Sequence, residues 1–309
     1  MGARRFFSIF LLTAFFAAFS GCASPQPIPK QRMRASEFDR KGADFYQQGQ
    51  YEKALVFFQK ALQVNESIDH REGVALSLNN MGTAYQSLGK LSRALECYQQ
   101  ALQINTKIGH RQGQSLNLNN IGSLSLALGK PQAALEFFQK SLEIEEKAGN
   151  IKAQAIRWNN IGLASRALGE NDRALECYQK AKTLNEKTEN VLGIADNLNN
   201  IGALFESQKD WPRALEAYQA ALEMDKRKEN SVGISTDLAS LGRLYEAMGE
   251  REKALDHYLR ALGVNEYLGL RDRILQDVAK IAALYEDLGK PEEAGRFRQR
   301  AHELTASPK

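Results

Sequence analysis

Pairs of neighbouring asparagines recur along this chain and are its clearest candidates for ligand contacts. The pairs stand 40 residues apart, and they are Asn79-Asn80, Asn119-Asn120, Asn159-Asn160 and Asn199-Asn200. A carboxamide carries both donors and an acceptor, so a row of carboxamides can hold the backbone of an extended peptide without reading its side chains. The same groups can instead bond to one another and keep neighbouring repeats in register.

A helical wheel separates the two asparagines of each pair. With 100° per residue, Leu78, Met81 and Tyr85 form one apolar stripe, and Asn80 falls opposite this stripe while Asn79 falls on its flank. We therefore expect the first asparagine of each pair to bond within the stack and the second to face a ligand. The predicted peptide-binding residues on the side opposite the core are Asn80, Asn120, Asn160, Asn200, Thr83, Leu76, Leu116 and Ile156.

The elements that position these residues also follow from the spacing. A fixed period of 20–50 residues is typical of a solenoid, and seven units of 40 fit this chain without insertion or deletion. Within the second unit the pattern predicts one helix from Ala75 to Leu88, ended by Gly89, and another from about Leu91 to Lys107. The predicted units lie near residues 33–70, 71–110, 111–150, 151–190, 191–230, 231–270 and 271–307.

This pattern resembles the tetratricopeptide repeat. The family's motif corresponds to Trp158-x₂-Ile161-Gly162, to Leu78-x₂-Met81-Gly82-x₂-Tyr85 and to Ala94-x₃-Tyr98. The resemblance implies an all-α, right-handed α-solenoid, a superhelix of about seven helix-turn-helix units over residues 34–307, with first helices lining a concave groove. The 40-residue period is similar to that of kinesin light chains and spindle-orientation adaptors. In peptide-binding members, an asparagine at the position of Asn80 contacts the peptide.

One subtype of the family does not fit. The chaperone-binding carboxylate clamp has a lysine and an asparagine in its first repeat, where this chain has Asp39 and Ala43. A further row of carboxylates consists of Glu206, Glu246 and Glu286. This row is interpreted either as a solvated face or as a selector of a basic partner segment.

The first residues form a separate segment. Arg4 and Arg5 precede the uncharged stretch 6–19, whose 14 residues span about 21 Å as a helix, less than a bilayer core. Phe19-Ser20-Gly21-Cys22 resembles a bacterial lipobox, which implies a lipoprotein signal peptide at 1–21 and acylation, including palmitate, of Cys22. Residues 22–33 are then a tether, and Ala23 favours the outer membrane, on its periplasmic face. A plain secreted protein with an incidental Cys22 is the alternative.

Composition excludes several classes of protein. The net charge of +4 falls to about +2 without Arg4 and Arg5, too balanced for a nucleic-acid partner. The chain has no nucleophile elbow, no P-loop, no dinucleotide fingerprint and no close metal-ligand spacing, so neither an enzyme nor a cofactor is expected. Cys97 and Cys177 occupy one repeat position and are predicted to be small core residues.

The functional prediction is a membrane-anchored scaffold that binds extended protein or peptide segments in its concave groove. Its predicted place is the bacterial cell envelope, where it would help to assemble a complex. A peptide-sensing or cell-wall-binding regulator is the alternative.

Overall fold

The chain folds as a stack of helices. The computed structural model describes residues 30–306, in which there are fourteen α-helices and no strand. The first eight helices are α1 (Lys30–Gln47), α2 (Tyr51–Ser67), α3 (Arg71–Ser87), α4 (Leu91–Lys107), α5 (Arg111–Ala127), α6 (Pro131–Lys147), α7 (Ile151–Ala167) and α8 (Asn171–Lys187). The remaining six are α9 (Val191–Ser207), α10 (Trp211–Arg227), α11 (Ser231–Ala247), α12 (Arg251–Tyr267), α13 (Arg271–Asp287) and α14 (Pro291–Ala306). The chain is therefore an all-α repeat solenoid, as the sequence predicts.

Two boundaries differ from the expectation. Helix α1 begins at Lys30, inside the predicted tether of residues 22–33, and α3 begins at Arg71 and not at Ala75. Both differences have one cause: the amphipathic stripe marks only the buried part of a helix, whereas its polar first turn continues the backbone hydrogen bonds. The predicted signal peptide and Cys22 lie outside the described residues. Within residues 30–306, no helix is long and apolar enough to cross a bilayer.

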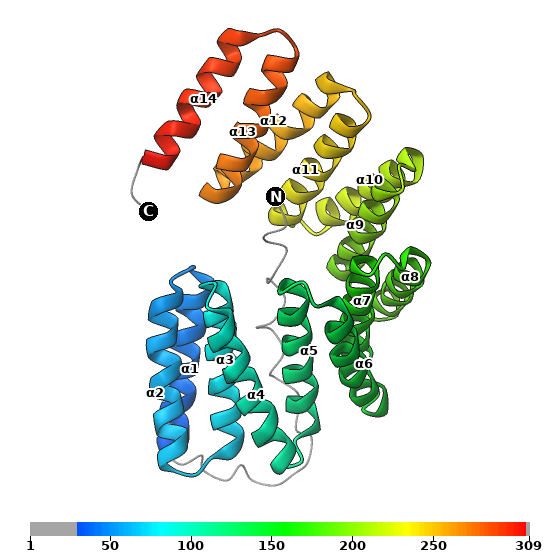
Figure 1. Ribbon diagram of the computed structural model, residues 1–309. Coiled ribbons are helices and arrows are strands. Elements are labelled where there is room, and N and C mark those ends of the chain that lie inside the picture. Colours follow the sequence, from blue (N-terminus) through cyan, green and yellow to red (C-terminus); the bar gives the residue numbers. More distant parts are fainter. Residues whose placement is uncertain (1–29, 307–309) are drawn as a thin grey trace. The chain divides into compact units, whose positions relative to one another are not determined.

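The helices form two compact units. The first unit ends at Leu128 and contains α1 to α5, and the second begins at Gly129 and contains α6 to α14 (Figure 1). The division falls inside the third predicted repeat, between its two helices. Each unit is described by itself below.

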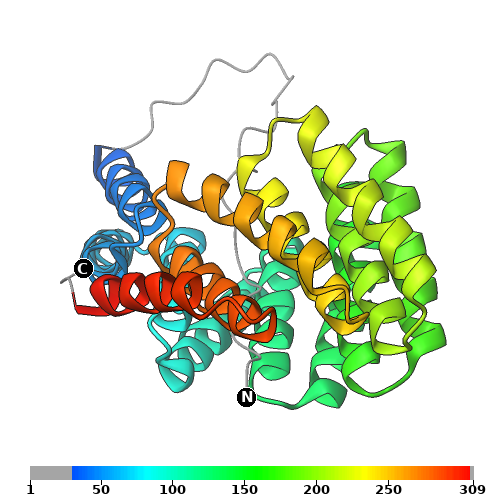
Figure 2. The same ribbon diagram turned by 90° about the horizontal axis from the view of Figure 1, so that it is seen from above.

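Most odd-numbered helices, which are the first helices of the repeats, contact the next odd-numbered helix of their unit. Every helix packs on the next one within its unit, and the successive pairs of the second unit, green to red, can be followed in Figure 2. In addition, α1 contacts α3 and α3 contacts α5, while in the second unit α7 contacts α9 and α9 contacts α11. No two even-numbered helices share comparable contacts among residues 30–306. We call the side of each unit that is formed by the first helices its inner side.

Left-handed residues end the helices. Gly89 has φ 73° and Gly169 has φ 80°, values that cost a glycine no steric penalty. Lys209 occupies the same place in the fifth repeat and is forced to φ 59°. The turn therefore keeps its shape where the glycine is lost.

Close helix crossings explain why small residues recur at the same positions of the repeats. A Cβ atom on Gly82 would lie 2.6 Å from the ring of Tyr98, and one on Gly162 would lie 2.6 Å from that of Tyr178. Each buried tyrosine ring thus fills the space that a glycine of the facing helix leaves. Cys97 and Cys177 are buried free thiols, as predicted for small core residues.

Candidate peptide-binding surface

Aliphatic side chains lie exposed on the inner side of each unit. Leu76 on α3 is 48% exposed, and Ile156 on α7 is 40% exposed. Leu116 on α5 is half-buried. A large exposed aliphatic side chain can bury apolar surface against a ligand without any rearrangement of the core.

The asparagine pairs of the first unit form a ladder across neighbouring repeats. The Asn120 amide nitrogen Nδ2 donates to Asn79 Oδ1 at 2.8 Å, and Asn117 Nδ2 donates to the same oxygen at 3.0 Å. The partners are 41 and 38 residues apart, so each bond joins one first helix to the preceding first helix. Because these groups are largely buried, losing one donor would cost about 1–3 kcal/mol.

The second unit repeats the arrangement. Asn200 Nδ2 donates to Asn159 Oδ1 at 2.8 Å, and Asn197 Nδ2 donates to that oxygen at 2.9 Å. Between α9 and α11 the direction of donation reverses, because Asn199 Nδ2 on the earlier helix donates to a carboxylate oxygen of Asp237 on the later one. The first asparagine of a pair therefore holds neighbouring repeats together, as the flank position on the wheel predicts.

The second asparagines of the pairs differ in how far they are buried. Asn120 is only 5% exposed, whereas Asn80, Asn160 and Asn200 are half-buried. Thr83, also a predicted groove residue, donates its hydroxyl to the Asn79 carbonyl at 3.1 Å. These polar groups bond within the stack, which the wheel does not predict for them, and their contact with a ligand stays a prediction.

A second row of buried amides, not predicted from the sequence, links the helices of consecutive repeats. Asn105 on α4 donates to Asn117 Oδ1 at 2.7 Å, and Asn185 on α8 donates to Asn197 Oδ1 at 2.8 Å. Each second helix is thereby linked to the first helix of the next repeat. The signal was present, because asparagine recurs at positions 65, 105, 185 and 265.

Asp39 closes the N-terminal end of the ladder. It accepts from Asn80 Nδ2 at 3.5 Å and from the Ser77 hydroxyl at 3.3 Å. Burial raises the pKa of Asp39 to about 7 and outweighs these two hydrogen bonds. An acid that is half protonated near neutral pH stands where the carboxylate clamp has its lysine, in agreement with the rejection of that subtype.

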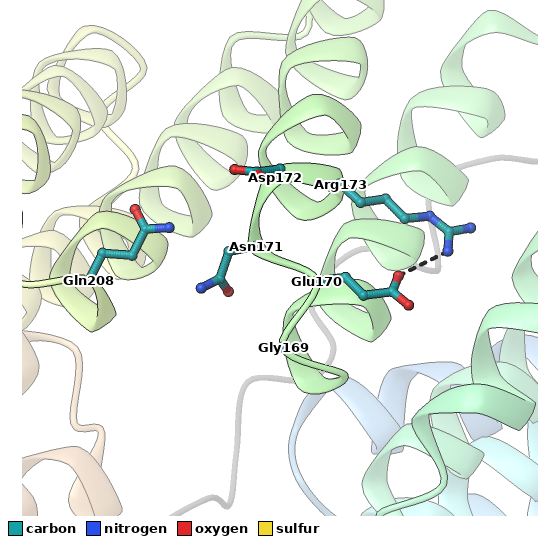
Figure 3. A pocket seen from close by; sticks show the side chains of 6 residues that line it. All are labelled: Gly169, Glu170, Asn171, Asp172, Arg173 and Gln208. Atoms are coloured by element: carbon teal, nitrogen blue, oxygen red, sulfur yellow. Dashed lines mark hydrogen bonds and ion pairs between the residues drawn. The ribbon is translucent and has the colours of Figure 1, made fainter.

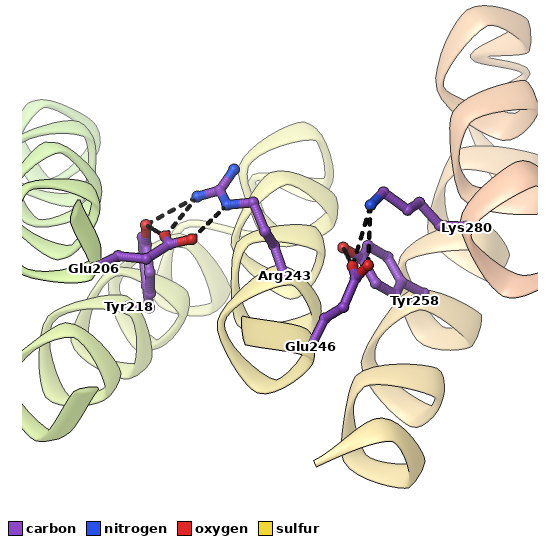
Figure 4. Close-up of polar contacts among 6 residues, drawn as sticks. All are labelled: Glu206, Tyr218, Arg243, Glu246, Tyr258 and Lys280. Carbon is purple, nitrogen blue, oxygen red and sulfur yellow. Dashed lines mark hydrogen bonds and ion pairs between the residues drawn. The ribbon is translucent and has the colours of Figure 1, made fainter. Parts of the chain in front are cut away.

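The predicted acidic row is paired inside the protein. Glu206 accepts from Arg243 Nε at 2.9 Å and Nη2 at 3.0 Å, and the Tyr218 hydroxyl donates to it at 2.6 Å (Figure 4). The next carboxylates follow the same pattern: Glu246 pairs with Lys280 and Tyr258 (Figure 4), and Glu286 pairs with Arg298. Since each carboxylate already has a cation, this row offers little net charge to a basic partner segment.

Two hollows on the described surface are open to solvent. The larger has about 720 Å³ and is lined by the turn from Gly169 to Arg173 and by Gln208, and Glu170 and Arg173 form an ion pair beside it (Figure 3). The smaller has about 360 Å³ and lies on the first repeat. Neither encloses a small molecule in the way that an enzyme's substrate pocket does. Residues 30–306 contain no group of three or more His, Cys, Asp or Glu side chains that could hold a metal ion.

Comparison with known proteins agrees with this architecture. A crystal structure of aspartyl phosphate phosphatase F from Bacillus subtilis has TM-score 0.68 at 14% identity, covering 90% of this chain and 72% of that chain. A Rap protein complexed with competence and sporulation factor has TM-score 0.66 at 16% identity, covering 88% and 75%. Nearly identical TPR-like repeats of a putative kinesin light chain from Podosopora anserina have TM-score 0.52 at 16% identity, covering 64% and 97%.

These likenesses concern the fold alone. The search of curated proteins found no significant match. A family model for the tetratricopeptide repeat matches residues 34–107, 93–147, 112–187, 153–227 and 193–266, which together span most of the helical region. The chain therefore belongs to the tetratricopeptide repeat family.

Proposed function

We propose that this protein is a membrane-anchored scaffold that binds extended segments of partner proteins along the inner side of its first helices. The tetratricopeptide fold is typically a protein-binding scaffold and not an enzyme. The observation that carries the proposal is the exposure of Leu76 and Ile156, each one helical turn before a half-buried asparagine. An apolar side chain beside an amide suits a peptide, whose side chains are often apolar and whose backbone is polar.

The ladder supports this role by fixing the amides. Asn80 uses Nδ2 to bond to Asp39, and Asn200 uses Nδ2 to bond to Asn159. No described residue donates to the carbonyl oxygen of Asn80 or Asn200, and both side chains remain partly exposed. An amide that is held by one N–H needs little further ordering when its oxygen accepts from a peptide N–H, so binding loses less side-chain entropy.

Site-specific photo-crosslinking in intact cells tests the binding surface. A photoreactive amino acid would replace Leu76 or Ile156, and matched controls would carry it at Val56 or Leu259, which are exposed aliphatic residues on second helices. Adducts with one protein at the first two positions and not at the controls would support the proposal. Adducts of equal yield at all four positions, or at the controls alone, would contradict it. Adducts with a small secreted peptide or with wall material would instead support a peptide-sensing or cell-wall-binding regulator.

The anchor belongs to the same proposal and has its own test. The lipobox-like ending at Cys22 supports acylation, and Ala23 supports a place at the outer membrane facing the periplasm. The proposed role in assembling an envelope complex rests on analogy with other lipidated repeat proteins. Cells fed a radiolabelled palmitate should label the wild type and not Cys22→Ser, and the variant should leave the membrane fraction. If the wild type takes up no label and is recovered in the membrane fraction to the same extent as Cys22→Ser, the lipid anchor is refuted. That result would not affect the proposed peptide-binding surface.

A further inference from the structure

The contacts between consecutive repeats show which helix packs against the N-terminal side of each repeat. In the first unit, Leu55 and Leu62 of α2 lie in one apolar cluster with Met81 and Cys97 of the following repeat. The second unit has the same arrangement, since Leu215 of α10 packs in the cluster that contains Tyr245. The partner of a repeat's N-terminal side is therefore a second helix that presents leucines spaced seven residues apart, except that α8 carries Lys182 in place of the second leucine.

The first repeat has this side but no preceding helix among the described residues. Its equivalent side chains are Phe38, Lys41, Phe45 and Phe57, which we name the aromatic end face. One repeat later the corresponding residues are Leu78, Met81, Tyr85 and Cys97. Leu78 and Cys97 are 7% and 8% exposed, whereas their counterparts Phe38 and Phe57 are only half-buried. Phe45 is half-buried, as is its counterpart Tyr85. The rings of Phe45 and Phe57 stack with centroids 5.2 Å apart, and the hollow of about 360 Å³ lies against them.

The opposite end of the chain is built differently. The residue equivalent to Leu55 is a leucine in each of the next five repeats, but in α14 it is Gly295. The residue equivalent to Leu62 in α14 is His302. Helix α14 therefore lacks both leucines that a second helix inserts into a following repeat. Its Arg298 and Arg300 are paired with Glu286 and Glu266. Helix α14 of a second copy therefore does not offer the paired leucines that the aromatic end face fits.

Three cations lie close to the rings of the aromatic end face. Arg34 lies 5.5 Å from the Phe38 ring centroid, Lys60 lies 5.1 Å from that of Phe57, and Lys53 lies 5.7 Å from that of Phe45. Lys53 and Lys60 form no ion pair with a carboxylate of residues 30–306, whereas Glu37 pairs with Lys41 and lies within the electrostatic influence of Arg34. The face thus combines half-buried rings with the unpaired positive charges of Lys53 and Lys60, which attract an acidic partner.

We propose that the aromatic end face binds an acidic amphipathic helix of a partner protein, which stacks on the first repeat as a second helix stacks on every later one. Two leucines seven residues apart would cover Phe38, Phe45 and Phe57. Acidic residues of that helix would lie beside Lys53 and Lys60. This site is distinct from the inner surface of the first helices, so it stands or falls independently of the proposed function.

The chain itself supplies a probe for this site. The probe is a synthetic helical peptide with the sequence of Tyr51–Ser67, in which Lys53 and Lys60 are both replaced by glutamate. Full-length protein should bind this peptide in a calorimetric titration. The protein variant Lys53→Glu/Lys60→Glu should weaken binding by about tenfold or more, because attraction becomes repulsion. Both lysines are exposed, so this variant should keep the wild-type helical content.

Matched controls separate the site from nonspecific attraction. The protein variant Lys226→Glu/Lys228→Glu reverses two exposed charges of the second unit and should leave the affinity unchanged. A probe with Leu55→Gly and Leu62→His, the residues found in α14, should not bind. Equal affinity for both charge variants, or for both probes, would overturn the proposal.

Other occupants give different outcomes. If the full chain fails to bind the probe and a chain that starts at residue 30 binds it, the protein's own N-terminal segment covers the face, and the partner helix is refuted. If light scattering finds a dimer that Phe45→Ser converts to a monomer, a second copy occupies the face, which also overturns the proposal.

Discussion

At the residue scale, one joint between repeats brings two acids together. Asp225 on α10 and Asp237 on α11 face each other, with Asn230 donating to the first at 2.9 Å and Asn199 donating to the second at 2.5 Å. The equivalent pairs in the other described joints each combine a donor with an acceptor: Asn65–Ser77, Asn105–Asn117, Glu145–Arg157, Asn185–Asn197 and Asn265–Asp277. Two buried carboxyl groups can satisfy each other only by holding a proton.

Stability should therefore fall as the pH rises. Burial raises the pKa of Asp237 to about 8 and also raises that of Asp225, and the neighbouring Asp196 adds to the rise at Asp237. The folded state then binds more protons than the unfolded state, whose aspartates titrate near about 4, so stability is lost between about pH 4 and 8. The variant Asp237→Asn keeps the bond from Asn199 and can donate to Asp225. In urea titrations it should be more stable than wild type at pH 8, by on the order of 1–3 kcal/mol, and much less so at pH 5.

The exposed Asp256→Asn serves as the control, since its side chain lies on the outside of α12. This control should not change the dependence of stability on pH. A wild-type protein whose unfolding free energy is constant from pH 5 to 8 would show that the two carboxyl groups do not share a proton.

The asparagine ladder yields a graded prediction. Asn120→Ala removes a buried donor that lies 2.8 Å from Asn79, and should lower the unfolding free energy by about 1–3 kcal/mol. Asn80→Ala removes a half-buried donor at 3.5 Å from Asp39 and should cost less. Denaturant midpoints of the two variants measure the difference. The reverse order would mean that the amide bonds of the ladder do not set its stability.

At the element scale, one helix end carries a residue that the turn does not favour. Lys209 takes φ 59° where most repeats have glycine, and a left-handed non-glycine residue costs about 1 kcal/mol. Lys209→Gly should therefore raise the melting temperature, which calorimetry can measure. Lys209→Ala should not, because alanine meets the same steric penalty. If both variants gain equally, the lysine side chain and not the backbone is the cause.

Periodicity explains why the helices could be predicted and their polar contacts could not. The predicted helix from Leu91 to Lys107 coincides with α4, because its stripe begins next to the turn at Gly89. By contrast, the wheel gives the direction of Asn120 on its own helix but not its distance from Asn79 on the neighbouring helix. That distance depends on the stagger between repeats, which sets the partners 41 residues apart. One sequence period cannot reveal the stagger.

At the scale of the whole molecule, a uniform period does not produce a uniform stack. The sequence predicts seven equivalent units, yet the chain divides into two compact units between Leu128 and Gly129, inside the third repeat. In a solenoid each repeat is stabilised by its own contacts and by those with its neighbours, so local destabilisation stays local unless the neighbours are tightly coupled. The division predicts that each unit responds separately to damage in its own core.

Two equivalent glycines test this independence. Gly82→Ala in the first unit would place a Cβ atom 2.6 Å from the Tyr98 ring, and Gly202→Ala in the second would place one 2.8 Å from the Tyr218 ring. Each overpacked crossing should cost about 1–3 kcal/mol. Hydrogen exchange followed by mass spectrometry should then show faster exchange in α1 to α4 for the first variant and in α8 to α12 for the second. If either variant accelerates exchange equally in both groups of helices, the chain unfolds as one cooperative body and the division carries no energetic meaning.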